Sequence, residues 1–347
     1  MRLPRFEYLG PETLEGALDL MATHGDGAKI LAGGTDLLVR MKKGLVRPET
    51  LISLKALDEL VYIKEETRQE KDCLVIGAKT PIADIIASDL VQKNAPALAQ
   101  ACERIGAVTL QHYVGTIAGN ILQDNRCQHY NQSQFHRSGR GACHKDGGKI
   151  CYARDNSDRC NSTCQSDGAA ALMALNASIT LHRKGGQRQV DLADFYTNDG
   201  ITPFAIEPHE LLTQICIPLQ GGHSAYKRLS YRSAIDYPLV CAGVILIPSP
   251  SSLTHISQAR IVVGAMGRSP LYMAAASASL KGKKLDDTQA FQSAGNAAMD
   301  TAATFGVHNV GSTLEYRCAM AAQMVFQALT QAGKAATLSM EKTTKAE

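Results

Sequence analysis

The chain has 347 residues, of which 45% are hydrophobic, and it carries a formal net charge of only +3. This length can hold two or three domains with cores of their own, and the composition is that of a globular protein. The small net charge argues against a nucleic-acid partner, no apolar run reaches the ~18–20 residues of a membrane span, and no signal peptide is evident, so we expect a cytoplasmic protein.

The first part of the chain predicts a small βαβ unit. Residues 12–24 have the apolar spacing of a helix, and short strands are expected at 28–31 and 50–54. Between these strands, Gly33 and Gly34 form a turn that leads into a helical pattern. Such a turn offers backbone N–H groups to an anion, although an ordinary turn between a strand and a helix has the same pattern.

The middle of the chain predicts further strands and helices around a second glycine turn. We expect strands at 73–77, 177–182, 189–191 and 211–218, and helices after Pro81, at 96–104 and at 167–175. The second glycine turn, residues 115–121, immediately precedes a cysteine-rich stretch. Asp167 follows that stretch and is expected to be the N-cap of an alanine-rich, tightly packed helix.

The last third of the chain predicts a sheet followed by helices. Strands of an antiparallel sheet are expected at 226–232, 240–247 and 259–267, and helices at 270–280, 288–304 and 313–331. Residues 333–347 are polar and are expected to form a mobile tail.

Residues 126–164 contain half of the ten cysteines and show no apolar period. The five thiols are Cys127, Cys143, Cys151, Cys160 and Cys164. A stretch of this composition cannot bury a core of its own, so we expect a metal site to order it. Its spacing is compatible with an iron–sulfur cluster, with zinc bound also by His129, His136 or His144, or with disulfides, and these alternatives stay open.

Four motifs together resemble a known family. They are LAGGTDLL at 31–38, GTIAGN at 115–120, SDGAAALMALNA at 166–177 and AYKRLSYR at 225–232. Their order and spacing resemble the FAD-binding medium subunit of molybdenum hydroxylases, the family of xanthine dehydrogenase and carbon monoxide dehydrogenase. The cysteine-rich insert, with RCxxYNQSxF and GxCxKDGGxxC, resembles the β subunit of 4-hydroxybenzoyl-CoA reductase, as does RSAIDYPLV at 232–240.

This resemblance implies an α+β fold. It consists of an FAD-binding PCMH-like fold of two α/β subdomains, a C-terminal domain with a three-stranded antiparallel sheet and a helix bundle, and a cysteine-rich cluster-binding insert. The implied bounds are 1–57 and 58–221 for the two FAD-binding subdomains, 123–165 for the insert, 222–332 for the C-terminal domain and 333–347 for the tail.

The resemblance also implies two cofactors, FAD and a 4Fe–4S cluster, and no catalytic residue on this chain. The family's ligand spacing maps onto Cys127, Cys143, Cys151 and Cys160, which leaves Cys164 outside the set. The implied FAD contacts are Leu31, Ala32, Gly33, Gly34, Thr35, Asp36, Leu37, Gly106, Thr116, Ile117, Ala118, Gly119, Asn120, Asp167 and Lys227.

The implied role is electron transfer in a dimer of heterotrimers with a large molybdopterin-binding subunit and a small 2Fe–2S subunit. The implied reaction removes the phenolic hydroxyl of 4-hydroxybenzoyl-CoA at the expense of reduced ferredoxin. Residues 126–164 carry four excess positive charges, which either balance the thiolates or dock the acidic ferredoxin near Arg137, Arg140 and Lys145. The alternatives are a subunit of an oxidative hydroxylase or dehydrogenase for an aromatic or N-heterocyclic compound, and a zinc-stapled binding module without flavin.

Overall fold

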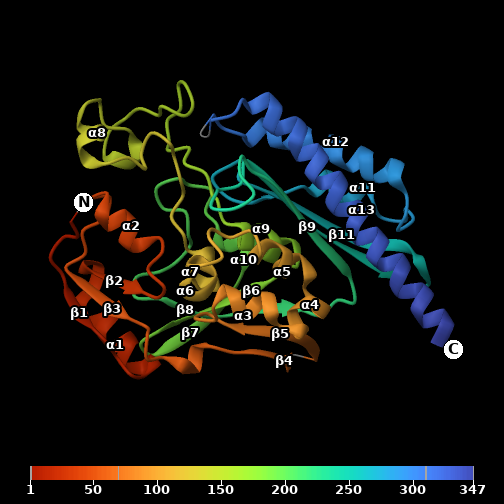
Figure 1. Cartoon of the computed structure of the whole chain (residues 1–347), viewed down its shortest axis with the longest axis horizontal. Coiled ribbons are helices and arrows are strands. Elements are labelled where there is room, and N and C mark those ends of the chain that lie inside the picture. Colours follow the sequence, from red (N-terminus) through yellow and green to blue (C-terminus); the bar gives the residue numbers. More distant parts are fainter. Residues whose placement is uncertain (1, 69, 309–310, 347) are drawn as a thin grey trace.

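The computed structural model describes residues 2–68, 70–308 and 311–346, and its three sheets follow one another along the chain (Figure 1). The N-terminal unit contains β1 (Glu7–Leu9), α1 (Leu14–His24), β2 (Ala28–Leu31), α2 (Leu37–Lys42) and β3 (Thr50–Ser53). Its parallel sheet has the order β1-β3-β2, which confirms the predicted βαβ unit and adds β1 at the edge. Ala17 and Leu18 of α1 pack against Ile52 of β3.

The second unit is built on a five-stranded antiparallel sheet of order β4-β5-β8-β6-β7. Its strands are β4 (Ile63–Arg68), β5 (Lys71–Gly77), β6 (Ser178–Arg183), β7 (Gly186–Asp191) and β8 (Leu211–Pro218). Its helices are α3 (Ile82–Ala87), α4 (Asp89–Asn94), α5 (Pro96–Cys102), α6 (Gln111–Val114), α7 (Ile117–Ile121), α9 (Asp167–Ala174) and α10 (Leu192–Phe195). The second glycine turn is therefore the start of helix α7, with Thr116 as its N-cap.

Helix α9 lies between the second unit and the C-terminal sheet, and all its residues are buried. A Cβ atom at Gly243 of the C-terminal sheet would lie 2.8 Å from the carbonyl oxygen of Ala170, so small residues permit this close approach. The prediction of a tightly packed alanine-rich helix is confirmed, but its N-cap is Ser166, whose Oγ accepts from the N–H of Ala169. Because Ser166 makes this bond, the carboxylate of Asp167 is available for other partners.

The C-terminal unit packs helices on one face of an antiparallel sheet (Figure 1). Its elements are β9 (His223–Leu229), β10 (Val240–Ser249), β11 (Ser252–Gly264), β12 (Leu271–Tyr272), α11 (Ala274–Ser279), α12 (Thr288–Phe305) and α13 (Leu314–Ala346). The predicted three strands are present, and the short β12 adds a fourth. Helix α13 does not end before residue 333, where we expected a tail, because Ala332 and Ala336 continue its buried face.

The cysteine lobe, residues 126–164, stands apart from the sheets and beside the end of α2 (Figure 1). Its regular structure is limited to α8 (Gln134–Ser138) and the 3-10 turn His144–Asp146. Further 3-10 turns in the chain are Gly25–Gly27 and Asp58–Leu60. The lobe's own core is a small cluster around Cys127, Tyr130 and Ala153, and its last residue, Cys164, lies in the core of the second unit. The α+β class predicted from the sequence is thus confirmed.

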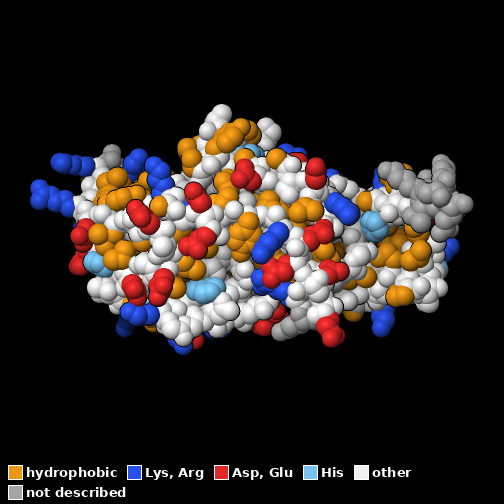
Figure 2. All heavy atoms as spheres, turned by 90° about the horizontal axis from the view of Figure 1, so that it is seen from below, with side chains coloured by type: hydrophobic (Ala, Val, Ile, Leu, Met, Phe, Trp, Pro, Cys, Tyr) orange, Lys and Arg blue, Asp and Glu red, His pale blue; other side chains and the backbone are white. Residues whose placement is uncertain are grey.

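The surface has no extended region of one charge on the face shown in Figure 2, where acidic and basic side chains alternate with apolar ones. Within the described residues, no helix combines the length and the apolar character that a membrane crossing requires.

Candidate functional site

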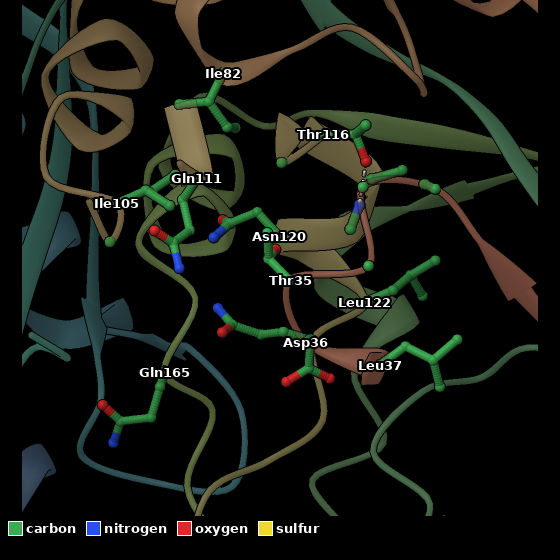
Figure 3. Close-up of a pocket in the computed structure, with 18 of the residues that line it drawn as sticks. Thr35, Asp36, Leu37, Ile82, Ile105, Gln111, Thr116, Asn120, Leu122 and Gln165 are labelled. Atoms are coloured by element: carbon green, nitrogen blue, oxygen red, sulfur yellow. Dashed lines mark hydrogen bonds between the residues drawn. The ribbon is translucent and has the colours of Figure 1, made fainter. Parts of the chain in front are cut away.

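A cavity of about 410 Å³, here called the large cavity, lies between the N-terminal unit, the second unit and the loop after β9. Most of the predicted FAD contacts line it, namely Ala32, Gly33, Gly34, Thr35, Asp36, Leu37, Gly106, Thr116, Ala118, Gly119, Asn120 and Asp167. The other three, Leu31, Ile117 and Lys227, are not among its lining residues, and Ile117 is buried in the core of the second unit. Figure 3 shows Gln111, Asn120 and Gln165 around the same space.

The two glycine turns meet at this cavity because one glycine permits their backbones to touch. A Cβ atom at Gly33 would lie 1.7 Å from the carbonyl oxygen of Val114, a distance that no side chain tolerates. Gly34 follows with φ +72°, a conformation that favours glycine. The first turn therefore needs both glycines, and the resulting cradle of backbone is of the kind that accepts phosphates.

A buried carboxylate borders the large cavity. Tyr226 donates a hydrogen bond of 2.5 Å to Asp167 Oδ1, and Arg228 Nη1 lies 3.0 Å from Asp167 Oδ2. Burial raises the pKa of Asp167 to about 6, while the guanidinium of Arg228 and the bond from Tyr226 act in the opposite direction. The chain neighbours of Lys227, Tyr226 and Arg228, hold the carboxylate of Asp167, and Lys227 itself stays a predicted FAD contact.

The loop after β9 covers part of the large cavity, to which it contributes Arg232, Ile235, Asp236 and Tyr237. The N–H of Ile235 donates to the carbonyl of Gly106, and Arg228 Nη2 donates to the carbonyl of Asp236. Both bonds attach this loop to the rest of the cavity wall. These residues belong to the RSAIDYPLV motif, and sequence reasoning used the motif to recognise a subfamily without assigning it to the site.

Gln165 supplies a polar group that fits a cofactor in the large cavity. It is 2% exposed, and Nε2 donates to Thr163 Oγ1 at 2.7 Å. Its Oε1 has no hydrogen-bond partner among the described residues. A buried acceptor without a partner carries a cost, which a donor group of a bound molecule removes. The polar wall, the backbone cradle and apolar side chains such as Ile82 and Ile105 suit a dinucleotide that has both polar and apolar parts.

The four predicted cluster ligands come together in the cysteine lobe. Cys127, Cys143, Cys151 and Cys160 all line a small cavity of about 10 Å³, here called the cysteine cavity. Cys164 does not line it, because its side chain is buried in the core of the second unit, where burial raises its pKa to about 12. All ten cysteines are free thiols in the structure.

The four thiols that line the cysteine cavity are a donor set that an iron–sulfur cubane would use. Within the described residues, no group of three or more His, Cys, Asp or Glu converges closely enough to hold one metal ion. In a cubane each iron takes its own thiolate, so four thiols around a shared space suit it. The cavity itself has the volume of about one water molecule, and the lobe must open for a cubane. Asn161 Nδ2, 3.4 Å from Cys151 Sγ, is a hydrogen-bond donor to one sulfur.

Burial raises the pKa of the thiols of Cys127 and Cys160, although a hydrogen bond with Ser162 partly opposes the shift at Cys160. The protonated form of both thiols is therefore favoured without a metal, and the positive charge of bound iron would favour the thiolate form.

The basic residues expected to dock ferredoxin contact other side chains of the lobe or, for Lys145, the neighbouring Asp124. Arg137 is 9% exposed, lies 3.2 Å from Asp146 and stands over the ring of Tyr130. Lys145 contacts Asp124 at 2.8 Å, and Arg140 covers Tyr152. The exposed charged residues of the lobe are three basic ones, Lys149, Arg154 and Arg159, and three acidic ones, Asp146, Asp155 and Asp158. Two of the three expected docking residues, Arg137 and Lys145, are thus engaged in ion pairs, and ferredoxin docking at the lobe stays a prediction.

The family follows from comparison with known proteins. Residues 4–220 match the family described as the FAD binding domain in molybdopterin dehydrogenase, and residues 224–332 match the carbon monoxide dehydrogenase flavoprotein C-terminal domain. The chain therefore belongs to the FAD-binding medium subunits of the molybdenum hydroxylase family, and it is an FAD-binding oxidoreductase subunit.

Individual relatives match over almost the whole chain. The carbon monoxide dehydrogenase medium chain of Afipia carboxidovorans is 30% identical over 94% of this chain and 96% of its own, and that of Hydrogenophaga pseudoflava is 29% identical over 95% and 97%. The structure of reconstituted carbon monoxide dehydrogenase from Oligotropha carboxidovorans is similar with a TM-score of 0.76 at 28% identity, covering 96% of this chain and 99% of that chain.

Proposed function

We propose that this chain is an electron-transfer subunit that carries FAD in the large cavity and one 4Fe–4S cluster in the cysteine cavity. The observation that supports the cluster is the gathering of Cys127, Cys143, Cys151 and Cys160 around one space, while Cys164 points elsewhere. The two cavities are adjacent along the chain, because Arg126 lines the large cavity and Cys127 lines the cysteine cavity. Free thiols are compatible with a reducing, cytoplasmic compartment.

The residues of the large cavity would bind and orient the dinucleotide. The turns at 32–36 and 116–120 supply backbone near the pyrophosphate, and Asp167, held by Tyr226 and Arg228, supplies a fixed carboxylate. Bound FAD supplies the ability to hold two electrons and to exchange them singly with iron–sulfur centres. No side chain of this chain is required for acid–base chemistry on a substrate.

The assembly in this proposal contains a large molybdopterin-binding subunit and a small 2Fe–2S subunit, arranged as a dimer of heterotrimers. Support comes from relatives that are themselves named as medium chains. The proposed reaction is the ferredoxin-dependent removal of the phenolic hydroxyl from 4-hydroxybenzoyl-CoA, and it rests on the resemblance of the insert. A flavin exchanges electrons with NAD by itself, so a cluster beside it suits a carrier that delivers single electrons.

A second candidate keeps the cofactors and reverses the direction of electron flow. Relatives include a nicotinate dehydrogenase FAD-subunit from Eubacterium barkeri and a nicotine 6-hydroxylase medium subunit from Paenarthrobacter nicotinovorans, with 26% and 24% identity. Their names favour an oxidative dehydrogenase or hydroxylase for an aromatic or N-heterocyclic compound. A zinc-stapled module without flavin, by contrast, is at odds with membership of an FAD-binding family.

The complex purified without oxygen tests the direction of electron flow. Reduced ferredoxin and 4-hydroxybenzoyl-CoA should give rapid substrate-dependent oxidation of the ferredoxin, whereas NADH in its place should give little. If the complex instead oxidises an N-heterocycle with an artificial acceptor and leaves the thioester unchanged, the second candidate replaces the first. Charge-reversal of exposed Lys149 and Arg154 makes the exposed charge of the lobe negative, so it should slow the ferredoxin rate if ferredoxin docks at the lobe.

A further inference from the structure

The cysteine lobe contributes a side chain to the large cavity. Arg126, the first residue of the lobe, lines that cavity and its side chain is only 15% exposed. Its backbone exchanges two hydrogen bonds of 2.8 Å with Thr163, so the two ends of the lobe are joined at this residue. Its guanidinium carbon lies 4.8 Å from the centre of the ring of Tyr237, on the loop after β9.

Arg126 neutralises an acidic residue in the wall of the large cavity. Asp36 stands at the N-cap position of α2, but its carboxylate makes no capping bond and lies 2.5 Å from Arg126 Nη2. Arg40, one turn further along α2, lies 3.8 Å from the same carboxylate. A cavity that binds the anionic pyrophosphate of FAD cannot hold an unpaired carboxylate in its wall without repulsion. The lobe therefore removes a charge that would oppose the ligand.

The same ion pairs continue to the cysteine cavity. Arg40 Nη2 lies 3.2 Å from Asp124 Oδ2, and Asp124 Oδ1 lies 2.8 Å from Lys145 Nζ. Lys145 lines the cysteine cavity together with Cys127, the neighbour of Arg126. Positive and negative groups thus alternate from one cavity to the other, and most of them are buried enough to interact strongly.

The lobe depends on such contacts because its own core is small. Outside the ion pairs, its contacts with the N-terminal unit are a bond of 2.9 Å from Lys43 Nζ to the carbonyl of Asn131, a bond from Arg47 Nη2 to Gln134 Oε1, and packing against Leu45. We propose that Arg126 is a positioning residue that couples FAD binding to the ordering of the cysteine lobe, so that the lobe completes the FAD site and FAD in turn holds the lobe in place. This inference rests on the FAD site of the proposed function and does not require the cluster.

Hydrogen–deuterium exchange of the full chain, with and without added FAD, tests the coupling. In the wild type, FAD should slow the exchange of amides between 127 and 160 by about tenfold or more, which corresponds to ~1.4 kcal/mol of coupling. Arg126→Gln should lose this protection and bind FAD about tenfold more weakly, whereas Arg126→Lys should recover part of both because it restores the charge. Arg159→Gln is the matched control, since Arg159 is an exposed arginine of the same lobe that pairs only with Asp158 in the described contacts.

A second variant separates charge repulsion from a folding defect. In Arg126→Gln combined with Asp36→Asn, FAD affinity should return towards that of the wild type, because the wall no longer carries a carboxylate whose remaining ion pair is the longer one of 3.8 Å with Arg40, while the protection of the lobe stays lost. Equal lobe exchange with and without FAD in the wild type would overturn the proposal, as would an Arg126→Gln variant that binds FAD as tightly as the wild type. A chain that shows the coupling but holds no iron would overturn the proposed cluster alone.

Discussion

Arg228 Nη1 lies 3.0 Å from Asp167 Oδ2, and both side chains are about 95% buried beside the large cavity. The same guanidinium donates to the main-chain carbonyls of Arg104 and Asp236, so one residue joins helix α9, the segment before α6 and the loop after β9. The pair is therefore expected to fix the shape of the FAD site as well as to stabilise the fold.

The first prediction concerns the pH dependence of stability. Burial places the pKa of Asp167 at about 6 in the folded chain, above its ordinary value near 4. The folded state therefore binds this proton more tightly than the unfolded state, and the associated stability is present below pH ~4 and lost as the pH rises through ~6. Denaturant unfolding of the FAD-free chain at several pH values should show this loss, of the order of 2–3 kcal/mol.

Asp167→Asn should remove that part of the pH dependence. Asp155→Asn, a change of an exposed carboxylate in the cysteine lobe, should retain it. Identical pH profiles for the wild type and Asp167→Asn between pH 4 and 7 would show that Asp167 does not titrate as its burial requires.

The second prediction concerns Arg228. Arg228→Met leaves the carboxylate of Asp167 buried without its cation and releases the loop after β9, so the free energy of unfolding should fall by about 3 kcal/mol at neutral pH. The dissociation rate of FAD should rise about tenfold, since the loop lines the large cavity. Stopped-flow flavin fluorescence measures the rate. Arg183→Met, which removes an exposed arginine paired with Glu207, should change neither quantity.

The third prediction concerns the first glycine turn. Gly33→Ala places a methyl group against the carbonyl of Val114, which forces the two turns apart and should weaken FAD binding by more than about tenfold in a chain that still folds. Gly34→Val should act similarly, because the backbone at φ +72° disfavours a branched side chain. Gly186→Ala is a suitable control, since its Cβ would meet no atom within 4 Å. Wild-type flavin content in Gly33→Ala would remove the turn from the site.

The fourth prediction concerns the fourth cluster ligand. Cys160→Ser should lose the cluster, because Cys160 lines the cysteine cavity, while Cys164→Ser should keep a full complement of iron. Iron and acid-labile sulfide are measured on both variants, with thermal unfolding to show that each is folded. The reverse pattern would assign the fourth ligand to Cys164.

The sequence predicted those parts of the fold whose pattern is local. The periodicity of 12–24, the glycines at 33 and 34 and the alanines of α9 each led to the correct element. It did not predict that α13 continues past 332, because alternating alanines and polar residues resemble a tail until the C-terminal sheet lies beside them. It also did not predict that Ser166 is the N-cap of α9, while Asp167 pairs with Arg228, which is distant in the chain.

The site residues that belong to a motif could be predicted from the sequence. Those that only tertiary contacts bring to the site could not. The glycine turns and the four cysteines were assigned by resemblance, and the structure places most of them at two cavities. The sequence did not identify Arg126, Gln165 and Tyr237 as site residues, because a single arginine, glutamine or tyrosine is not part of a recognisable spacing pattern. The sequence also did not predict that Arg137 is buried and paired with Asp146, because a count of charges does not show which of them form ion pairs.

The decisive measurement is the cofactor content of the 347-residue chain purified without oxygen. We expect one FAD, four iron atoms and four sulfides per chain, together with the Mössbauer signature of a 4Fe–4S cluster in the isolated subunit. A chain that binds FAD but contains zinc, or less than one iron atom per flavin after cluster reconstitution, would contradict this expectation.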